Sequence, residues 1–98
     1  MEAVVKEKFK GSAVRVFDFC SQEILIKPCL DDSGHVVVKV ELMLLTFGYL
    51  GLIVKKKEFA GDFDLTVKYI ESMPVKEIER YCNELAGMYQ QVKKEFGE

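Results

Sequence analysis

The sequence has little of the chemistry that enzymes and metal sites use. Its single histidine is His35, and its three cysteines, Cys20, Cys29 and Cys82, are widely spaced with no C-x-x-C pair. Structural zinc sites favour closely paired ligands, and the 31–33 segment beside His35 carries no nucleophile-elbow pattern. We therefore expect no catalytic residue, no metal and no cofactor. The chain is predicted not to be an enzyme, with His35 an exposed turn residue.

The chain also lacks a strong net charge and a long apolar run. Its formal net charge is −2, which gives no global field to attract nucleic acid or anionic lipid. The longest nearly uncharged run, from Leu42 to Val54, would cross only about 20 Å as a helix, against roughly 30 Å for a bilayer core. We interpret this run as buried sheet and expect no membrane span.

The start of the chain shows no basic segment followed by an apolar one, so no signal peptide is visible. The odd number of cysteines argues against a disulfide framework. Together these features favour reduced thiols at Cys20, Cys29 and Cys82 and a cytoplasmic location. A Cys20–Cys29 bridge is the alternative.

Apolar residues are abundant, at 49% of the chain, and charged residues make up 31%. This balance favours a folded chain over a disordered one, and we expect a single domain over residues 1–98. A stripe with spacings of three and four runs through the last quarter at Val75, Ile78, Cys82, Leu85, Tyr89, Val92 and Phe96. With Pro74 in its first turn, this stripe predicts one amphipathic helix over 74–96 that lies on an apolar surface.

The chain upstream of that helix is typical of strands and turns. Asp31-Asp32-Ser33-Gly34 is the strongest turn, because Asp and Ser side chains bond nearby backbone donors and Gly accepts a positive φ. Residues 12–20 fit a strand, and a short helix with Ser12 as its N-cap is the alternative. The expected strands are 3–9, 12–20, 23–27 ending at Pro28, 35–45, 52–59 and 63–70, with turns at 46–51 and 60–62.

Short connections of this kind require antiparallel pairing. The predicted fold class is therefore α+β, an antiparallel meander sheet of about five or six strands packed against one long C-terminal helix. This order of strands and one final helix resembles that of pleckstrin-homology-like and helix-grip domains. The resemblance is one of architecture and implies no function.

Apolar residues exceed what one side of a small sheet needs. Five of them cluster at the end of the 35–45 strand and around a glycine-rich corner: Met43, Leu45, Phe47, Tyr49 and Leu50. An exposed apolar patch of this kind usually marks a binding surface. We therefore predict a non-enzymatic protein-interaction or assembly module that self-associates through these residues, as a homodimer or with another protein partner.

Two alternatives remain open. A curved sheet and its helix could carry a small apolar ligand or lipid, since mixed aliphatic and aromatic linings suit such cavities. The basic run Lys55–Lys57, with Phe59, Lys68 and Tyr69 as partners, could bind phosphate or nucleic acid, although the net charge disfavours nucleic acid. The same lysines also fit an edge strand that deters edge-to-edge aggregation.

Overall fold

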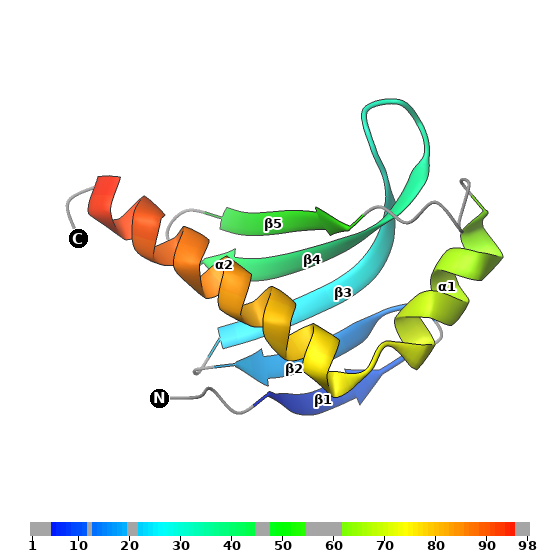
Figure 1. Ribbon diagram of the computed structural model, residues 1–98, viewed down its shortest axis with the longest axis horizontal. Helices are drawn as coiled ribbons and strands as arrows, with labels where there is room; N and C mark the ends of the chain where they lie inside the picture. Colours follow the sequence, from blue (N-terminus) through cyan, green and yellow to red (C-terminus); the bar gives the residue numbers. More distant parts are fainter. Residues whose placement is uncertain (1–4, 12, 20–21, 45–47, 55–61, 96–98) are drawn as a thin grey trace.

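A five-stranded antiparallel meander sheet is followed by two helices (Figure 1). This computed structural model describes residues 5–11, 13–19, 22–44, 48–54 and 62–95. The strands pair in the order β1-β2-β3-β4-β5. The elements are β1 Lys6–Lys10, β2 Arg15–Phe19, β3 Gln22–Leu30, β4 Val36–Leu44, β5 Gly48–Val54, α1 Phe63–Ser72 and α2 Val75–Glu95. The predicted α+β meander with a long C-terminal helix is confirmed, with five strands in the sheet.

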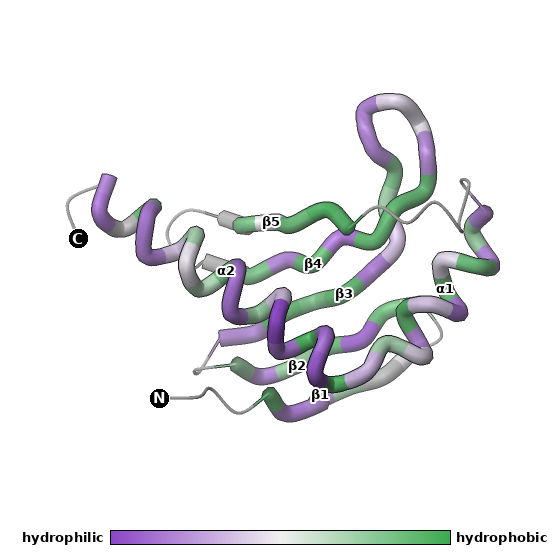
Figure 2. The backbone as a smooth tube through the Cα atoms, viewed as in Figure 1, coloured by the Kyte–Doolittle hydropathy of each residue, from purple (hydrophilic) through white to green (hydrophobic). Residues whose placement is uncertain are grey.

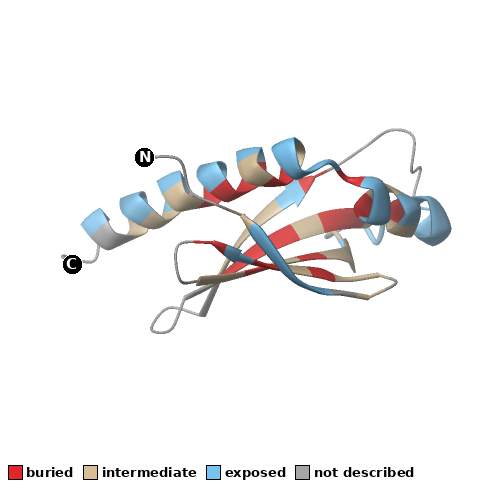
Figure 3. Ribbon diagram, turned by 90° about the horizontal axis from the view of Figure 1, so that it is seen from below, coloured by how far each residue is buried: buried red, intermediate tan, exposed pale blue. Residues whose placement is uncertain are grey.

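Both helices lie on one face of the sheet (Figure 3). Buried side chains fill the layer between the sheet and the helices. Alternate residues of the central strands are fully buried there, namely Ile24, Ile26, Val38, Val40 and Leu42. From α2, Ile78, Cys82 and Leu85 join the same cluster, and Val92 is half-buried. The predicted helical stripe is confirmed from Ile78 to Val92, whereas Val75 is exposed and Phe96 lies outside the described residues. Each such side chain stabilises the fold by about 1.5–3 kcal/mol relative to exposure.

The strands β3 and β4 extend beyond their neighbours as a hairpin arm, which we define as residues 28–37 (Figure 1). Its tip is the predicted turn. Asp31 Oδ1 accepts the backbone N–H groups of Ser33 and His35, each at 2.9 Å. Gly34 has a φ of 81°, which residues with a Cβ rarely adopt. The expectation that acids in this turn cap backbone donors is confirmed for Asp31.

The prediction that Pro28 ends β3 is wrong, because the strand continues to Leu30. The pairing between β2 and β3 stops where Arg15 lies opposite Ile26. Beyond that point β3 is paired on one side only, with Pro28 opposite Val38 of β4. Proline is tolerated in a strand at such an edge position, because its missing donor need not serve a neighbour.

The prediction of a strand over 63–70 is also wrong, because this segment forms α1. Asp62 caps the helix: its Oδ1 accepts the N–H of Leu65 at 3.2 Å, and its carbonyl accepts the Thr66 hydroxyl at 2.8 Å. Thr66 and Ile70 lie four residues apart and are fully buried, whereas Leu65 is exposed. The cap and the helical spacing of buried residues therefore outweigh the apolar alternation.

The remaining boundaries differ from the prediction at both ends of the sheet. Residues 15–19 form a strand, which favours the strand interpretation of 12–20 over the described part of that segment. β1 covers 6–10 where 3–9 was expected, and residues 3–4 lie outside the described residues. β5 begins at Gly48, so the predicted turn over 46–51 is wrong from that residue onwards. Gly51 lies inside the strand, opposite Glu41. The predictions made for 45–47 and 55–59 fall outside the described residues.

Candidate functional site

The two outer strands of the sheet differ in composition and regularity. β1 has the sequence KEKFK, with lysine at every second position, and its pairing with β2 shifts register between Glu7 and Phe9. β5 has the sequence GYLGLIV, with no charged residue, and pairs with β4 without a shift over its seven residues. Figure 2 shows β5 in the hydrophobic colour along most of its length.

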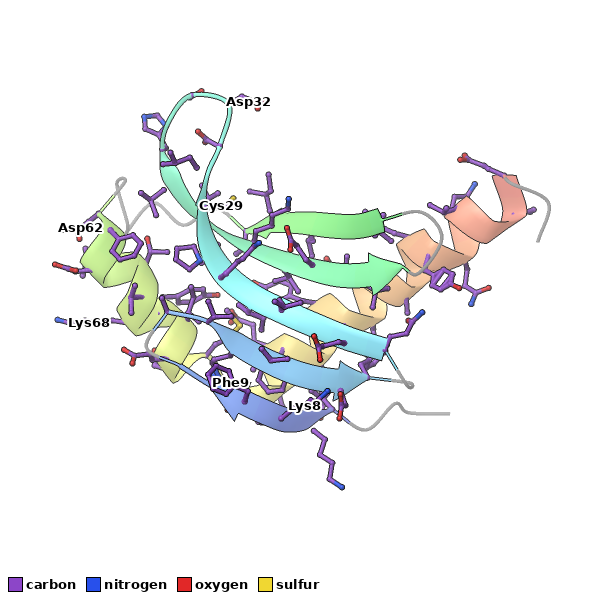
Figure 4. The ribbon with its side chains drawn as sticks, turned by 180° about the vertical axis from the view of Figure 1, so that it is seen from behind. Lys8, Phe9, Cys29, Asp32, Asp62 and Lys68 are labelled. Atoms are coloured by element: carbon purple, nitrogen blue, oxygen red, sulfur yellow. The ribbon has the colours of Figure 1, made fainter. Side chains whose placement is uncertain are left out.

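On β1 the exposed ammonium group of Lys8 forms ion pairs with acidic side chains of β2 and β3. Lys8 Nζ lies 3.0 Å from Glu23 Oε2 and 3.8 Å from Asp18 Oδ1. The hydrogen bond to Glu23, with the nearby Asp18 charge, raises the pKa of Lys8 above its ordinary value. Phe9 is exposed next to it (Figure 4). A strand that approached β1 would have to displace water from this ammonium group, which disfavours pairing there.

On β5 the side chains divide between two faces. Leu50 and Leu52 are half-buried against the core, and Val54 is buried in it. Ile53 lies on the face opposite the helices, called here the outer face, and is 47% exposed. No described strand lies beyond β5 (Figure 1). Alternate backbone N–H and C=O groups of such an outer strand point away from the sheet and can pair with another chain.

The structure describes part of the segment predicted to bind a partner. Met43 and Tyr49 are register partners on β4 and β5, and Leu50 follows Tyr49 on β5. Leu50 is half-buried against the core, so its side chain is less available than the sequence suggested. Leu45 and Phe47 lie outside the described residues. The described part of the segment therefore belongs to the β4–β5 pair at one edge of the sheet.

A buried carboxylate that the sequence analysis missed lies on the outer face. Glu41 is 6% exposed, with Oε1 3.0 Å from Lys39 Nζ and Oε2 3.2 Å from Lys27 Nζ. Burial alone would raise the pKa of Glu41, but the hydrogen bonds from Lys39 and Lys27 outweigh it and hold the pKa below its ordinary value. The carboxylate is therefore kept ionised, which does not suit proton exchange near neutral pH.

Gly51 leaves room for this ion cluster. A Cβ atom on Gly51 would lie 2.8 Å from Cε of Lys39, closer than side-chain atoms normally approach. Lys39 is opposite Ile53 in the register, and its side chain passes Gly51 to reach Glu41. The Lys39 ammonium thus bonds to a residue of its own strand, β4. The middle residue of β5, Gly51, adds no side chain.

Arg15 is a second buried charge, and it connects the sheet to the helices. Its Nη1 donates to the carbonyl groups of Ile70 and Met73 at 3.0 and 2.9 Å, and its Nη2 donates to Glu7 Oε2 at 3.1 Å. The guanidinium also lies 5.2 Å from the centre of the Phe17 ring. The last carbonyl groups of a helix lack partners within it, so this cation stabilises the end of α1. We assign Arg15 a structural role.

A polar cluster joins α1 to α2. Glu77 accepts hydrogen bonds from the Tyr69 hydroxyl and, at 3.3 Å, from the Tyr81 hydroxyl. Arg80 stacks on the Tyr81 ring, 5.0 Å from its centre, and its Nη2 donates to the Tyr81 hydroxyl. This bond, with the Glu77 and Glu84 carboxylates nearby, raises the pKa of Arg80. These groups satisfy one another, which suits fixing the angle between two helices.

The structure places all of the residues considered for catalysis and metal binding except Cys20. His35 is exposed on the hairpin arm, as predicted, with Nδ1 4.0 Å from Asp31 Oδ2. Cys29 is half-buried on the arm, Cys82 is fully buried in the core, and Cys20 lies outside the described residues. Within the described ranges no group of three or more His, Cys, Asp or Glu side chains could hold a metal ion.

None of the described helices is long and apolar enough to cross a membrane. Lys55–Lys57 lie outside the described residues, so phosphate or nucleic-acid binding stays a prediction, and so does the carriage of a small apolar ligand. No protein-family model, curated protein or solved structure matches the chain. The candidate site is the outer edge of β5, on the basis of strand order, composition and register.

Proposed function

We propose that the protein is a non-enzymatic assembly module that self-associates through β5. The observation that carries the proposal is an outer strand of seven residues that is uncharged, pairs in regular register with β4, and has no described strand on its other side. Such an edge is a template for another strand, and proteins that keep their edges apart use lysines and bulges to do so. β1 has both of these devices, and β5 has neither.

The free energies of backbone pairing, association and apolar burial together indicate a contact of moderate strength. Pairing over seven residues forms roughly seven backbone hydrogen bonds, each worth about 0.5–1.5 kcal/mol net. Association costs about 4–15 kcal/mol in lost freedom of motion, so backbone pairing alone roughly balances that cost. Apolar side chains on β5, Ile53 among them, add about 25 cal/mol for each Å² that they bury. Dissociation in the micromolar range, near −8 kcal/mol, therefore requires the contact to bury on the order of 300 Å² of apolar surface, and this is the range we expect.

Sedimentation of the full chain at several protein concentrations tests the proposal. We expect a monomer–dimer equilibrium for the parent and, for Ile53→Lys, a dissociation constant raised by about tenfold or more. Ile53 is exposed on the outer face, so this change adds charge to the edge without entering the core. Phe9→Lys is the matched control, because it places the same charge at an exposed apolar position on β1.

A parent that stays monomeric at high micromolar concentration would contradict the proposal. Equal weakening by Phe9→Lys and Ile53→Lys would also count against β5 as the contact strand. Leu50→Glu is a less selective variant, because Leu50 packs against the core and a charge there also weakens the fold. Thermal unfolding followed by circular dichroism should accompany it, to separate loss of assembly from loss of folding.

A further inference from the structure

We infer that the partner of β5 is the β5 strand of a second copy, paired antiparallel about a two-fold axis that passes beside Gly51. This inference rests on the proposed function and adds its geometry. The two five-stranded sheets would then form one continuous sheet. Three properties of the strand support it: its length, its charge pattern and the distribution of its side chains.

The length of β5 selects the register. When a strand pairs with its own copy about a two-fold axis, one residue lies opposite itself, and its neighbours pair symmetrically around it. The described, uncharged stretch of β5 runs from Gly48 to Val54, and its middle residue is Gly51. Centring there places Gly48 opposite Val54 of the second copy and Leu50 opposite Leu52, and all seven residues overlap. Any other centre leaves part of the uncharged strand unpaired.

The charge pattern selects the same register. Lys55–Lys57 follow Val54 directly in the sequence. With the centre at Gly51, the two Val54 residues stand six positions apart along the strands, about 20 Å at 3.4 Å per residue. With the centre at Ile53, they would stand two positions apart, about 7 Å. The screening length at physiological salt is about 8 Å, so the register centred at Gly51 holds the two Val54 residues, which precede the lysines, farther apart than this length, whereas the register centred at Ile53 does not.

The side chains also match across the axis. Residues two apart share a face of a strand, so the half-buried Leu50 of one copy meets Leu52 of the other on the helix side. The helices of both copies would lie on the same side of the joined sheet. At the axis, Gly51 meets Gly51 with no side chain between the backbones. Each Lys39 keeps its bond to Glu41 on its own β4.

Cysteine cross-linking tests the register directly. In the full chain with Cys20→Ser and Cys29→Ser, we would introduce Gly51→Cys in one variant and Ile53→Cys in another. At the axis the two Cα atoms would lie about 4.5–5.5 Å apart, within the range of about 4.4–6.8 Å that disulfides span. The two position-53 residues would stand four positions apart, about 14 Å along the strands, which is too far for a disulfide.

With oxidised glutathione as the oxidant, we expect most of the Gly51→Cys variant to become a covalent dimer on non-reducing electrophoresis. Little of the Ile53→Cys variant should do so. The new side chain in Gly51→Cys meets only the flexible end of Lys39, which can move aside. If this variant does not fold, a double variant with Leu50→Cys and Leu52→Cys tests the same register, because these positions face each other across the axis.

The failure of this inference differs from the failure of the proposed function. Cross-linking of Ile53→Cys without Gly51→Cys, in a protein that sediments as a dimer, would overturn the register while leaving self-association intact. A dimer in which neither the Gly51→Cys nor the double variant cross-links would place the contact elsewhere. A protein that is monomeric by sedimentation would overturn both statements.

Discussion

The first and last strands of this sheet occupy equivalent positions and carry opposite sequences. β1 is short, has three lysines and is interrupted by a register shift. β5 is longer, uncharged and regular. Both strands have one side without a described neighbour, so both face the same risk of pairing with another chain. Only one of them carries the lysines and the register shift that deter such pairing, and on this contrast we propose that the other is adapted for contact.

The faces of the sheet show a related difference. The helix side is an apolar core, whereas the outer face holds an ion cluster in which the buried Glu41 carboxylate lies between two partly exposed lysines. Buried charges that satisfy one another contribute little net stability, but they penalise any arrangement that separates them. The cluster thus fixes the register of β3 and β4 beside β5. The backbone groups of β5 that point away from β4 are the part of this strand available to a partner.

The largest expected effect concerns the support of β5 by α2, which packs across β4 and β5. Leu85 is fully buried in this layer. Leu85→Ala should lower the free energy of unfolding by about 2–5 kcal/mol, because it removes buried methyl groups and leaves a cavity. Met88→Ala, at an exposed position one turn along the helix, should change it by no more than about 0.5 kcal/mol. Urea denaturation measures both, and equal effects would show that α2 does not hold β5.

A smaller effect is expected from Glu41, which fixes the outer face beside β5. Glu41→Gln should lower the free energy of unfolding at neutral pH by about 1–3 kcal/mol, because it weakens charge-assisted bonds to Lys39 and Lys27. Glu71→Gln on the exposed side of α1 is the matched control and should have little effect. If the two variants are equally stable in chemical denaturation, the cluster does not fix the outer face.

The same carboxylate predicts the pH dependence. The pKa of Glu41 in the folded protein lies below its ordinary value, which is about 4.3 in an unfolded chain. The folded state therefore binds this proton less tightly than the unfolded state does. The stabilisation is fully present above about pH 4.3 and is lost as the pH falls through the folded pKa. Glu41→Gln should reduce this loss of stability in acid, as measured by denaturation at a series of pH values. An unchanged acid dependence would contradict the assignment.

The smallest effect on stability, and the sharpest test of the comparison, comes from removing the charges of β1. Replacing Lys6, Lys8 and Lys10 together by Thr keeps strand propensity and should change the unfolding free energy by less than about 0.5 kcal/mol per site. We expect the variant to form assemblies larger than a dimer, seen by light scattering, because the second edge can then pair. The register shift between Glu7 and Phe9 limits how far this growth proceeds.

The matched control removes the same number of charges from the helices. Lys68, Lys76 and Lys94 are exposed there, and their replacement by Gln should leave the assembly size of the parent unchanged. If the β1 variant scatters no more light than this control, the lysines of β1 do not protect it. The contrast between the two edges would then rest on the bulge alone.

The parts of the fold that the sequence predicted are those set by local pattern. The stripe through Ile78 and Leu85 has one period and fits one structure, and the turn at Asp31 is specified by its own side chain. The prediction of a strand over 63–70 failed because the apolar alternation of this segment also fits a short helix. The deciding features, the Asp62 cap and the burial of Thr66, depend on what the helix packs against.

The candidate site could be predicted less well, because it depends on strand order. The uncharged sequence of β5 and the lysines of β1 are both readable, yet neither says which strands are outermost. The end of β3 was predicted wrongly at Pro28 for the same reason, since a strand that is paired on one side only tolerates proline. Glu41 forms an ion pair with Lys27, which is distant in sequence and adjacent only in the folded sheet. These features follow from pairing between strands, which no local pattern reports.

Amide hydrogen exchange at low and high micromolar protein concentration tests the central claim most directly. Alternate amides of β5 point away from β4, and pairing with a second copy would shield them from solvent. We predict that exchange in Gly48–Val54 slows as the concentration rises, while exchange in Lys6–Lys10 does not change. Exchange in β5 that is independent of concentration, or protection that appears in β1 instead, would contradict the account.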